Sequence, residues 1–207
     1  MKMDKVANSN NDEFYTPPYA IKPIMPHLRP GSTVWCPFDT EDSLYVKMLR
    51  SDGHTVIATH ISAGEDFFTT PTPPGVDYVV SNPPYSLKTE VLLELFKRGT
   101  PFAMLLGVVG LFESQKRFEM FRDNSFEIMY MNRRVSYFKD YEDQKPELNP
   151  PFSSVYLCSG VLPRQVMFEE IDKKDLTFDA QSPGLVCDEL QKLAPEVIKK
   201  ESHGHGK

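Results

Sequence analysis

The chain has 207 residues, of which 40% are hydrophobic and 25% are charged, and this globular mix excludes a chain that is disordered throughout. Its longest apolar stretch, residues 101–112, is far shorter than the ~20 residues that a membrane-spanning helix needs. The net charge of -6 excludes a uniformly basic nucleic-acid binder, so any nucleic acid would have to meet a local cationic patch.

The length predicts one well-buried domain with appendages. We expect a flexible N-terminal lead at residues 1–13, a main domain at residues 14–162, and a C-terminal extension at residues 163–207 whose last residues are disordered. The polar start lacks the apolar run of a secretory signal, and the three cysteines are scattered. The sequence therefore predicts a cytoplasmic protein with reduced cysteines and no membrane partner.

The main domain alternates strands with helices. Apolar, β-branched runs predict strands at residues 32–36, 54–61, 76–81 and 101–109. Apolar residues at helical spacing predict helices at residues 41–50, 87–98 and 113–122. Thr16 stands before two prolines, a pattern that predicts a helix capped by the threonine hydroxyl. Together these elements predict an α/β fold with a doubly wound, mostly parallel sheet that helices cover on both faces.

The later part of the chain has a different pattern. Residues 126–138 and 151–158 predict two strands on either side of a polar loop at residues 139–150, which indicates a C-terminal antiparallel hairpin. Residues 165–171 predict a further short strand, and residues 185–200 predict an amphipathic helix.

The segment Asn82-Pro83-Pro84-Tyr85 comes directly after a predicted strand and before a predicted helix. At the carboxyl end of a parallel strand, it would face the ligand crevice of the sheet. The prolines stiffen the turn, and the Asn82 side-chain oxygen and the Pro83 carbonyl could accept both hydrogens of an amino group. Tyr85 offers a ring for a flat base. The same pattern is also typical of an ordinary rigid turn between a strand and a helix.

At this place in the chain, the motif resembles the signature of the amino-methyltransferases that act on adenine N6, in which Asn or Asp, two prolines, and Tyr or Phe end a strand. The likeness covers about residues 14–162. Within this family, the chain resembles especially the small phage- and prophage-encoded members. It implies a Rossmann-like fold of the class I methyltransferase type and S-adenosylmethionine as the cofactor. Asn82, Pro83, Pro84 and Tyr85 would then be the catalytic residues.

The resemblance also implies a set of cofactor-binding residues in three segments. They are Tyr15, Thr16 and Pro17 near the methionine part of the cofactor, Pro37, Phe38, Asp39 and Ser43 in the loop after the first strand, and Asp66 and Phe67 around its adenine.

The chain departs from the family pattern at two places. The loop at residues 37–43 contains no glycine, although close approach of the backbone to a cofactor usually needs one, so Asp39 and Ser43 would supply polar contacts instead. The second strand ends on His60, where the family commonly presents a carboxylate to the ribose. Neutral His60 could accept one ribose hydrogen bond, or it could be an ordinary core or surface residue.

Substrate contacts are expected from cations and rings near the same edge of the sheet. Lys88, Arg133 and Arg134 would contact phosphates, although such cations are usually part of a solvated surface. Adenine has to be flipped out of a duplex before its amine can react. Tyr137 or Phe138 could then close over its second face, although aromatic residues are more often buried in a core.

We therefore expect transfer of a methyl group from S-adenosylmethionine to adenine N6 in DNA, with RNA as the less favoured polymer and no metal. The alternative is a catalytically inactive methyltransferase-like fold that binds a protein or nucleic acid, for example as a phage counter-defence module. Sequence motifs for zinc sites, phosphate-binding loops and hydrolase nucleophiles are absent.

Overall fold

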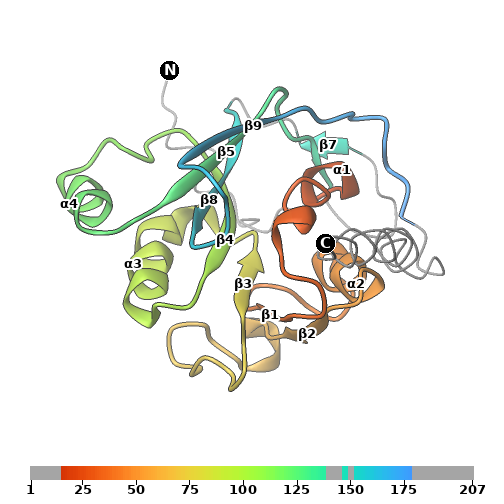
Figure 1. Cartoon of the computed structure of the whole chain (residues 1–207), viewed down its shortest axis with the longest axis horizontal. Coiled ribbons are helices and arrows are strands. Elements are labelled where there is room, and N and C mark those ends of the chain that lie inside the picture. The colour runs from red at the N-terminus through yellow and green to blue at the C-terminus, as the bar shows by residue number, and fades with distance from the viewer. Residues whose placement is uncertain (1–14, 139–145, 149–151, 179–207) are drawn as a thin grey trace, which may run out of the picture.

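The computed structural model describes residues 15–138, 146–148 and 152–178 (Figure 1). The main sheet consists of β1 (Thr33–Cys36), β2 (Thr55–Ala58), β3 (Tyr78–Ser81), β4 (Phe102–Gly107), β5 (Glu127–Met131), β8 (Ser154–Ser159) and β9 (Val166–Glu169). The α-helices are α1 (Pro18–Ile21), α2 (Leu44–Ser51), α3 (Lys88–Arg98) and α4 (Gln115–Asp123). Short 3-10 helices are η2 (Met25–His27), η3 (Ile61–Ala63) and η4 (Tyr85–Leu87). A second, two-stranded sheet pairs β6 (Tyr137–Phe138) with β7 (Pro146–Leu148).

The seven strands of the main sheet lie in the order β2-β1-β3-β4-β8-β5-β9. β1 is parallel to β2 and β3, β3 is parallel to β4, and β5 is parallel to β9. β8 is antiparallel to both of its neighbours, β4 and β5. Six of the seven strands therefore run in one direction, which confirms the α/β, Rossmann-like fold and the mostly parallel sheet. The expected antiparallel pair is also present, with β8 inserted between β4 and β5.

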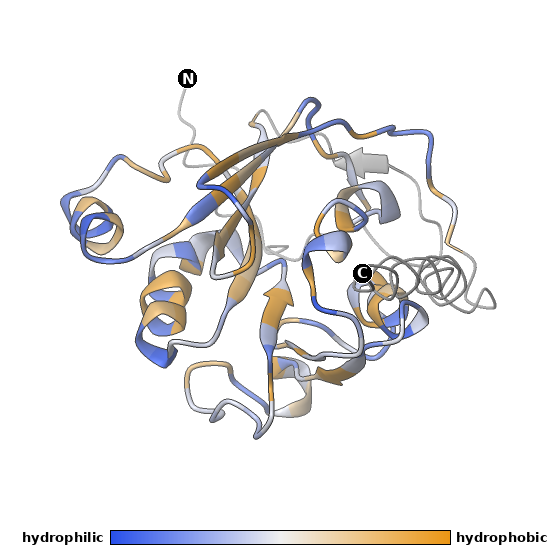
Figure 2. Cartoon of the chain, viewed as in Figure 1, coloured by the Kyte–Doolittle hydropathy of each residue, from blue (hydrophilic) through white to orange (hydrophobic). Residues whose placement is uncertain are grey.

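Helices cover both faces of this sheet, with α1 and α2 on one side and α3 and α4 on the other (Figure 1). In β4, Ala103 and Leu105 pack into the core under α1 and α2, whereas Phe102, Met104 and Leu106 pack into the core under α3 and α4. Figure 2 shows the hydrophobic residues that run along the strands between these layers. Because its side chains alternate between two buried faces, β4 is apolar along its whole length.

Helix α2 begins and ends where its local sequence indicates. The Ser43 side chain accepts a hydrogen bond from the Tyr45 N–H (3.2 Å) at its start, and Gly53 follows its end with a φ of 89°. The prediction for Thr16 is wrong, because Pro17 occupies the N-cap position of α1. Within the described residues, the buried Thr16 hydroxyl has no hydrogen-bond partner.

The single strand expected at residues 126–138 is also wrong, because the chain divides there into β5 and β6. The Asn132 N–H donates to the Glu169 carbonyl (2.9 Å), and the Asn132 side chain accepts from the Ile171 N–H (3.0 Å). These bonds hold Asn132 against the end of β9, and residues 137–138 pair with β7 instead. The polar loop expected at residues 139–150 accordingly contains β7.

The main sheet continues past residue 162, since β9 belongs to it. The flexible lead expected at residues 1–13 and the helix expected at residues 185–200 lie outside the described residues. No described helix has the length and hydrophobicity to cross a membrane.

Candidate active site

The loops that follow the parallel strands meet at one edge of the main sheet. Asp39 follows β1, His60 follows β2 and Asn82 follows β3. They line a cleft that opens to solvent. Its wall includes these sequence-predicted residues: Tyr15, Pro37, Phe38, Asp39, Ser43, His60, Asp66, Phe67, Asn82 and Pro84. The fold therefore brings eight of the ten cofactor candidates and two of the motif residues to one surface.

A buried carboxylate lies at the base of this cleft. Asp39 is 7% exposed, and one of its oxygens accepts a hydrogen bond from the Ser43 hydroxyl (2.5 Å). The other oxygen accepts a hydrogen bond from the Ser81 hydroxyl, at the end of β3. Burial raises the pKa of Asp39 to about 6, although both serine hydroxyls and the nearby His60 oppose this shift. Asp39 and Ser43 therefore organise the cleft wall as well as facing it.

The four motif residues have different surroundings. Asn82 lines the cleft and is partly buried, whereas Pro83 is buried beneath it. Tyr85 begins η4, and its hydroxyl donates to the Tyr137 hydroxyl (2.5 Å). Its ring meets the Phe152 ring edge-on, with 5.6 Å between ring centroids. Burial raises the pKa of Tyr85 well above its ordinary value, so the phenol stays protonated and continues to donate.

Tyr137 and Phe138 belong to the hydrophobic core. Of the two roles that the sequence allowed, closing over a base or packing in the core, the structure shows core packing. Both residues are fully buried, so neither offers a ring face to a base in this structure. Tyr137 bonds through its hydroxyl to Ser154 (2.8 Å), and burial raises its pKa to about 12. The Phe138 backbone pairs with that of Tyr15 (2.9 and 3.3 Å). Tyr137 therefore holds Tyr85, which follows the cleft residue Pro84, and Phe138 holds Tyr15, which lines the cleft.

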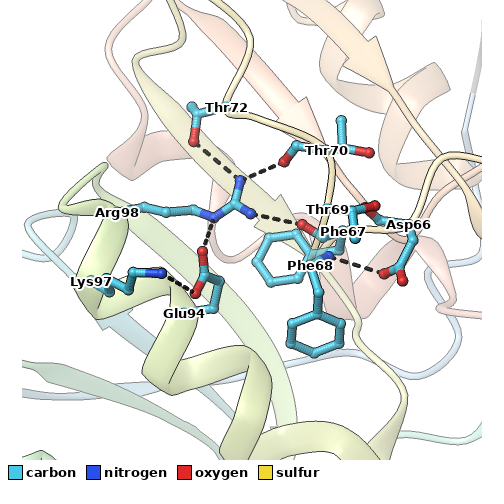
Figure 3. Close-up of polar contacts among 9 residues, drawn as sticks. All are labelled: Asp66, Phe67, Phe68, Thr69, Thr70, Thr72, Glu94, Lys97 and Arg98. Atoms are coloured by element: carbon cyan, nitrogen blue, oxygen red, sulfur yellow. Dashed lines mark hydrogen bonds and ion pairs between the residues drawn. The ribbon is translucent and has the colours of Figure 1, made fainter.

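One wall of the cleft is aromatic. The Phe38 and Phe67 ring centroids lie 4.9 Å apart, and the buried Phe67 also packs against Trp35 (5.6 Å). Arg98 reaches from α3 to the loop that carries Phe67, as Figure 3 shows. Its guanidinium lies 4.6 Å from the Phe67 ring centroid and donates to the carbonyls of Phe67 (2.7 Å) and Thr70 (2.9 Å). This arginine therefore fixes the loop and the ring together.

Two polar candidates on the wall also shape their own loops. The His60 Nδ1 lies 2.7 Å from the Ser62 hydroxyl and accepts from the Ser62 N–H (3.2 Å), so His60 caps η3. The Asp66 carboxylate accepts a hydrogen bond from the Phe68 N–H (3.0 Å). Within the part of the chain that the structure describes, His, Cys, Asp and Glu side chains form no group of three that could hold a metal ion.

The remaining candidates lie away from the cleft wall. Thr16 and Pro17 are buried. The Lys88 ammonium donates to the Val109 carbonyl (2.5 Å), and burial, followed by the nearby charge of Arg117, lowers its pKa. Arg133 and Arg134 are exposed just beyond the end of β5, at the same edge of the sheet as the cleft.

Three wall residues were not predicted from sequence, namely Thr40, Ile61 and Leu87, whereas Glu65 and Phe68 flank the predicted Asp66 and Phe67. Ile61 is 68% exposed, and its position next to His60 is the only sequence signal for it. Arg98 had no signal, because a cation at the end of an amphipathic helix is typical of a solvated face.

Comparisons with known proteins do not assign this chain to a family. No protein-family model matches the sequence, and no curated protein matches it. Among solved structures, the chain is similar to a precorrin-6y C5,15-methyltransferase from Geobacter metallireducens GS-15. The TM-score is 0.41 and the identity 14%, and the match covers 73% of this chain and 96% of that one. A likeness of this size assigns neither a substrate nor a functional residue to this chain.

Proposed function

We propose that this protein transfers a methyl group from S-adenosylmethionine to the N6 amino group of adenine in DNA. The observation that supports this most directly is the position of Asn82. It lies at the carboxyl end of a central parallel strand, on the wall of a cleft that also holds Phe38, His60 and Asp66. An amide acceptor on a proline-stiffened turn, next to a cleft with an aromatic wall, is the arrangement that methylation of an amino group needs.

The charges on the wall fit this cofactor. Asp39, Glu65 and Asp66 are acidic, and none of the described residues on the wall is a lysine or an arginine. Such a wall favours a ligand with positive groups over one with phosphates. When bound, S-adenosylmethionine supplies a methyl group on a positively charged sulfur. Phe38 would pack against its adenine, and His60 and Asp66 would accept hydrogen bonds from its polar groups.

The residues of the motif would act by positioning. The lone pair of the adenine amine is delocalised into the ring, so the amine reacts only when it is held and oriented. The Asn82 oxygen and the Pro83 carbonyl would accept its two hydrogens, which turns the lone pair outward. Positioning of this kind can lower a barrier by ~7–11 kcal/mol. Tyr85, held by Tyr137, would offer its ring to the flipped base.

DNA is proposed as the polymer because cations lie near this edge. Arg133 and Arg134 are exposed and follow β5, and the half-buried Lys88 follows the motif. These residues would contact phosphates beside the flipped nucleotide.

The decisive experiment has two parts. Calorimetric titration with S-adenosylmethionine should show binding to the wild-type chain and to Asn82→Ala. Methyl transfer to adenine-containing DNA should then fall by about 100-fold in Asn82→Ala. Asn124→Ala is the matched control, because it also removes a partly buried side-chain amide. Asn124 is the C-cap residue of α4, and its amide donates a hydrogen bond to the Met120 carbonyl (2.8 Å). Undiminished transfer by Asn82→Ala would overturn the assignment.

A second candidate is the catalytically inactive fold that binds a partner. The observation in its favour is that both Asp39 oxygens already accept hydrogen bonds from serines of the same chain, in a loop without glycine. Absence of binding at millimolar S-adenosylmethionine would favour this candidate over the enzyme.

A further inference from the structure

The strand β9 forms one edge of the main sheet, and within the described residues no strand lies beyond it (Figure 1). Its two faces differ. Met167 packs against the core under α1 and α2, whereas Val166 and Phe168 are 46% and 80% exposed. The Phe168 ring stacks on its cross-strand neighbour Tyr130, with 5.9 Å between centroids. Edge strands with exposed apolar side chains readily pair with another strand.

The direction of the backbone groups limits how a partner strand could pair. The carbonyls of Gln165 and Glu169 accept hydrogen bonds from Ile128 (2.7 Å) and Asn132 (2.9 Å), so these residues turn their backbone groups toward the sheet. Because such groups alternate along a strand, Val166 and Phe168 turn theirs to the open side. In an antiparallel partner, each of these two residues needs an opposite residue whose groups also point outward.

A second copy of the same strand meets this requirement. A two-fold axis at Met167 places Val166 opposite Phe168 of the second copy, and the reverse pair forms on the other side of the axis. The backbone groups of Val166 and Phe168 point to the open side, so two hydrogen-bonded residue pairs form. Each pair places an exposed valine beside an exposed phenylalanine and covers both side chains. If the partner strand were shifted by one residue, backbone groups that point to the open side would lie opposite backbone groups that point into the sheet. That register is therefore excluded.

The charges that flank the strand agree with the same arrangement. Arg164 and Glu170 are both exposed and lie three residues on either side of Met167. The two-fold axis therefore places Arg164 of each copy opposite Glu170 of the other. Two opposite-charge pairs at the ends and two apolar pairs inside them make the segment self-complementary, which is the property of an interface between identical subunits.

We propose that two copies of this chain associate through antiparallel pairing of their β9 strands, so that the main sheet continues from one copy into the other. This proposal does not depend on methyl transfer or on any ligand.

Sedimentation velocity of the full chain over micromolar to submillimolar concentrations tests it. We expect a monomer–dimer equilibrium. Arg164→Glu and Glu170→Arg should each weaken the dimer at least about tenfold, because each replaces two attractive pairs by two repulsive ones. The double variant Arg164→Glu/Glu170→Arg should recover wild-type association, and so should an equimolar mixture of the two single variants.

The exposed ring provides a matched pair of variants. Phe168→Lys should abolish the dimer, since a lysine on an edge strand opposes pairing. Phe118→Lys, which alters an aromatic residue of 56% exposure on α4, should leave the dimer unchanged.

Cysteine cross-linking tests the register, in a Cys187→Ser background. A mixture of Val166→Cys and Phe168→Cys chains should form a disulfide between the two variants faster than either variant forms one alone, because only mixed pairs are directly opposite.

Three outcomes would overturn the proposal. The first is a wild-type chain that stays monomeric throughout the range. The second is a dimer that survives Phe168→Lys and both charge reversals, because it would use another surface. The third is a monomeric wild type whose melting temperature falls in Phe168→Lys but not in Phe118→Lys, which would mean that another segment of the same chain covers β9.

Discussion

The Asp39 carboxylate accepts a hydrogen bond from the hydroxyl of Ser81, the residue directly before Asn82. Its second oxygen accepts from Ser43, which caps α2. One buried carboxylate thus joins the loop after β1, the start of α2 and the end of β3. The position of Asn82 on the cleft depends on this junction.

Replacement of Asp39 by Asn should change how stability depends on pH. The folded-state pKa of Asp39 is about 6, above the ordinary value of 3.8, so the folded chain holds this proton more tightly than the unfolded chain. The stabilising contribution of the protonated group is complete below pH 3.8 and is lost as the pH rises to about 6. The free energy of unfolding should therefore fall by about 3 kcal/mol over this window in the wild type relative to Asp39→Asn.

Urea unfolding at intervals from acidic to neutral pH measures this difference. The control is Asp42→Asn, in the same loop, whose side chain is 84% exposed. Its stability should follow the wild-type curve. A wild-type curve parallel to that of Asp39→Asn would contradict the prediction.

Tyr137→Phe should disturb Tyr85 without opening the core. The change removes the acceptor of the Tyr85 hydroxyl and the partner of Ser154, so the free energy of unfolding should fall by about 1–2 kcal/mol. Tyr45→Phe is the comparison, because it breaks another buried pair, the bond to the Tyr156 hydroxyl (2.8 Å), at a similar cost. If Tyr85 stacks on the base, kcat for methyl transfer should fall roughly tenfold in Tyr137→Phe only. An equal loss of kcat in both variants would mean that the Tyr85–Tyr137 hydrogen bond contributes only to stability.

Arg98→Ala should destabilise the protein far more than Lys97→Ala. Arg98 is 11% exposed at its side chain, and its loss leaves the carbonyls of Phe67 and Thr70 without a donor. We expect a cost of about 2–4 kcal/mol in the free energy of unfolding. Lys97 is 78% exposed and pairs with Glu94, so its removal should cost less than about 1 kcal/mol. Chemical denaturation of both variants measures the contrast, and similar costs would argue against an anchoring role for Arg98. S-adenosylmethionine binding should weaken in Arg98→Ala as well, because the loop at residues 65–68 lines the cleft.

Gly107→Ala should displace the Phe152 ring. A β-carbon at Gly107 would lie 2.7 Å from the nearest ring atom, which is too close for van der Waals contact. The clash should lower the free energy of unfolding by about 1–3 kcal/mol and disturb Tyr85, whose ring packs against Phe152. The double variant Gly107→Ala/Phe152→Leu should regain part of the loss, since leucine can give way. Thermal unfolding compares the single and double variants, and a double variant no more stable than Gly107→Ala would place the strain elsewhere.

The fold class and the place of the motif could be predicted from local sequence patterns. Strands that are apolar along their whole length can be buried only between two layers of helices, and this pattern is local enough to be recognised from neighbouring residues. Because parallel strands end at one edge of a sheet, the sequence predicts that Asn82, His60 and Asp39 lie near one another.

The accessibility of these side chains and the contacts that hold them depend on long-range packing, which local sequence patterns do not indicate. The division of residues 126–138 into β5 and β6 depends on pairing with residues 146–148 and with Tyr15, which is more than 100 residues away in the sequence. The burial of Tyr137 and the two serine bonds of Asp39 likewise require strands that lie side by side. Among the described strands, β9 is at the edge because it pairs with β5 alone, and the strand order that places it there is set by long-range packing and not by a local pattern.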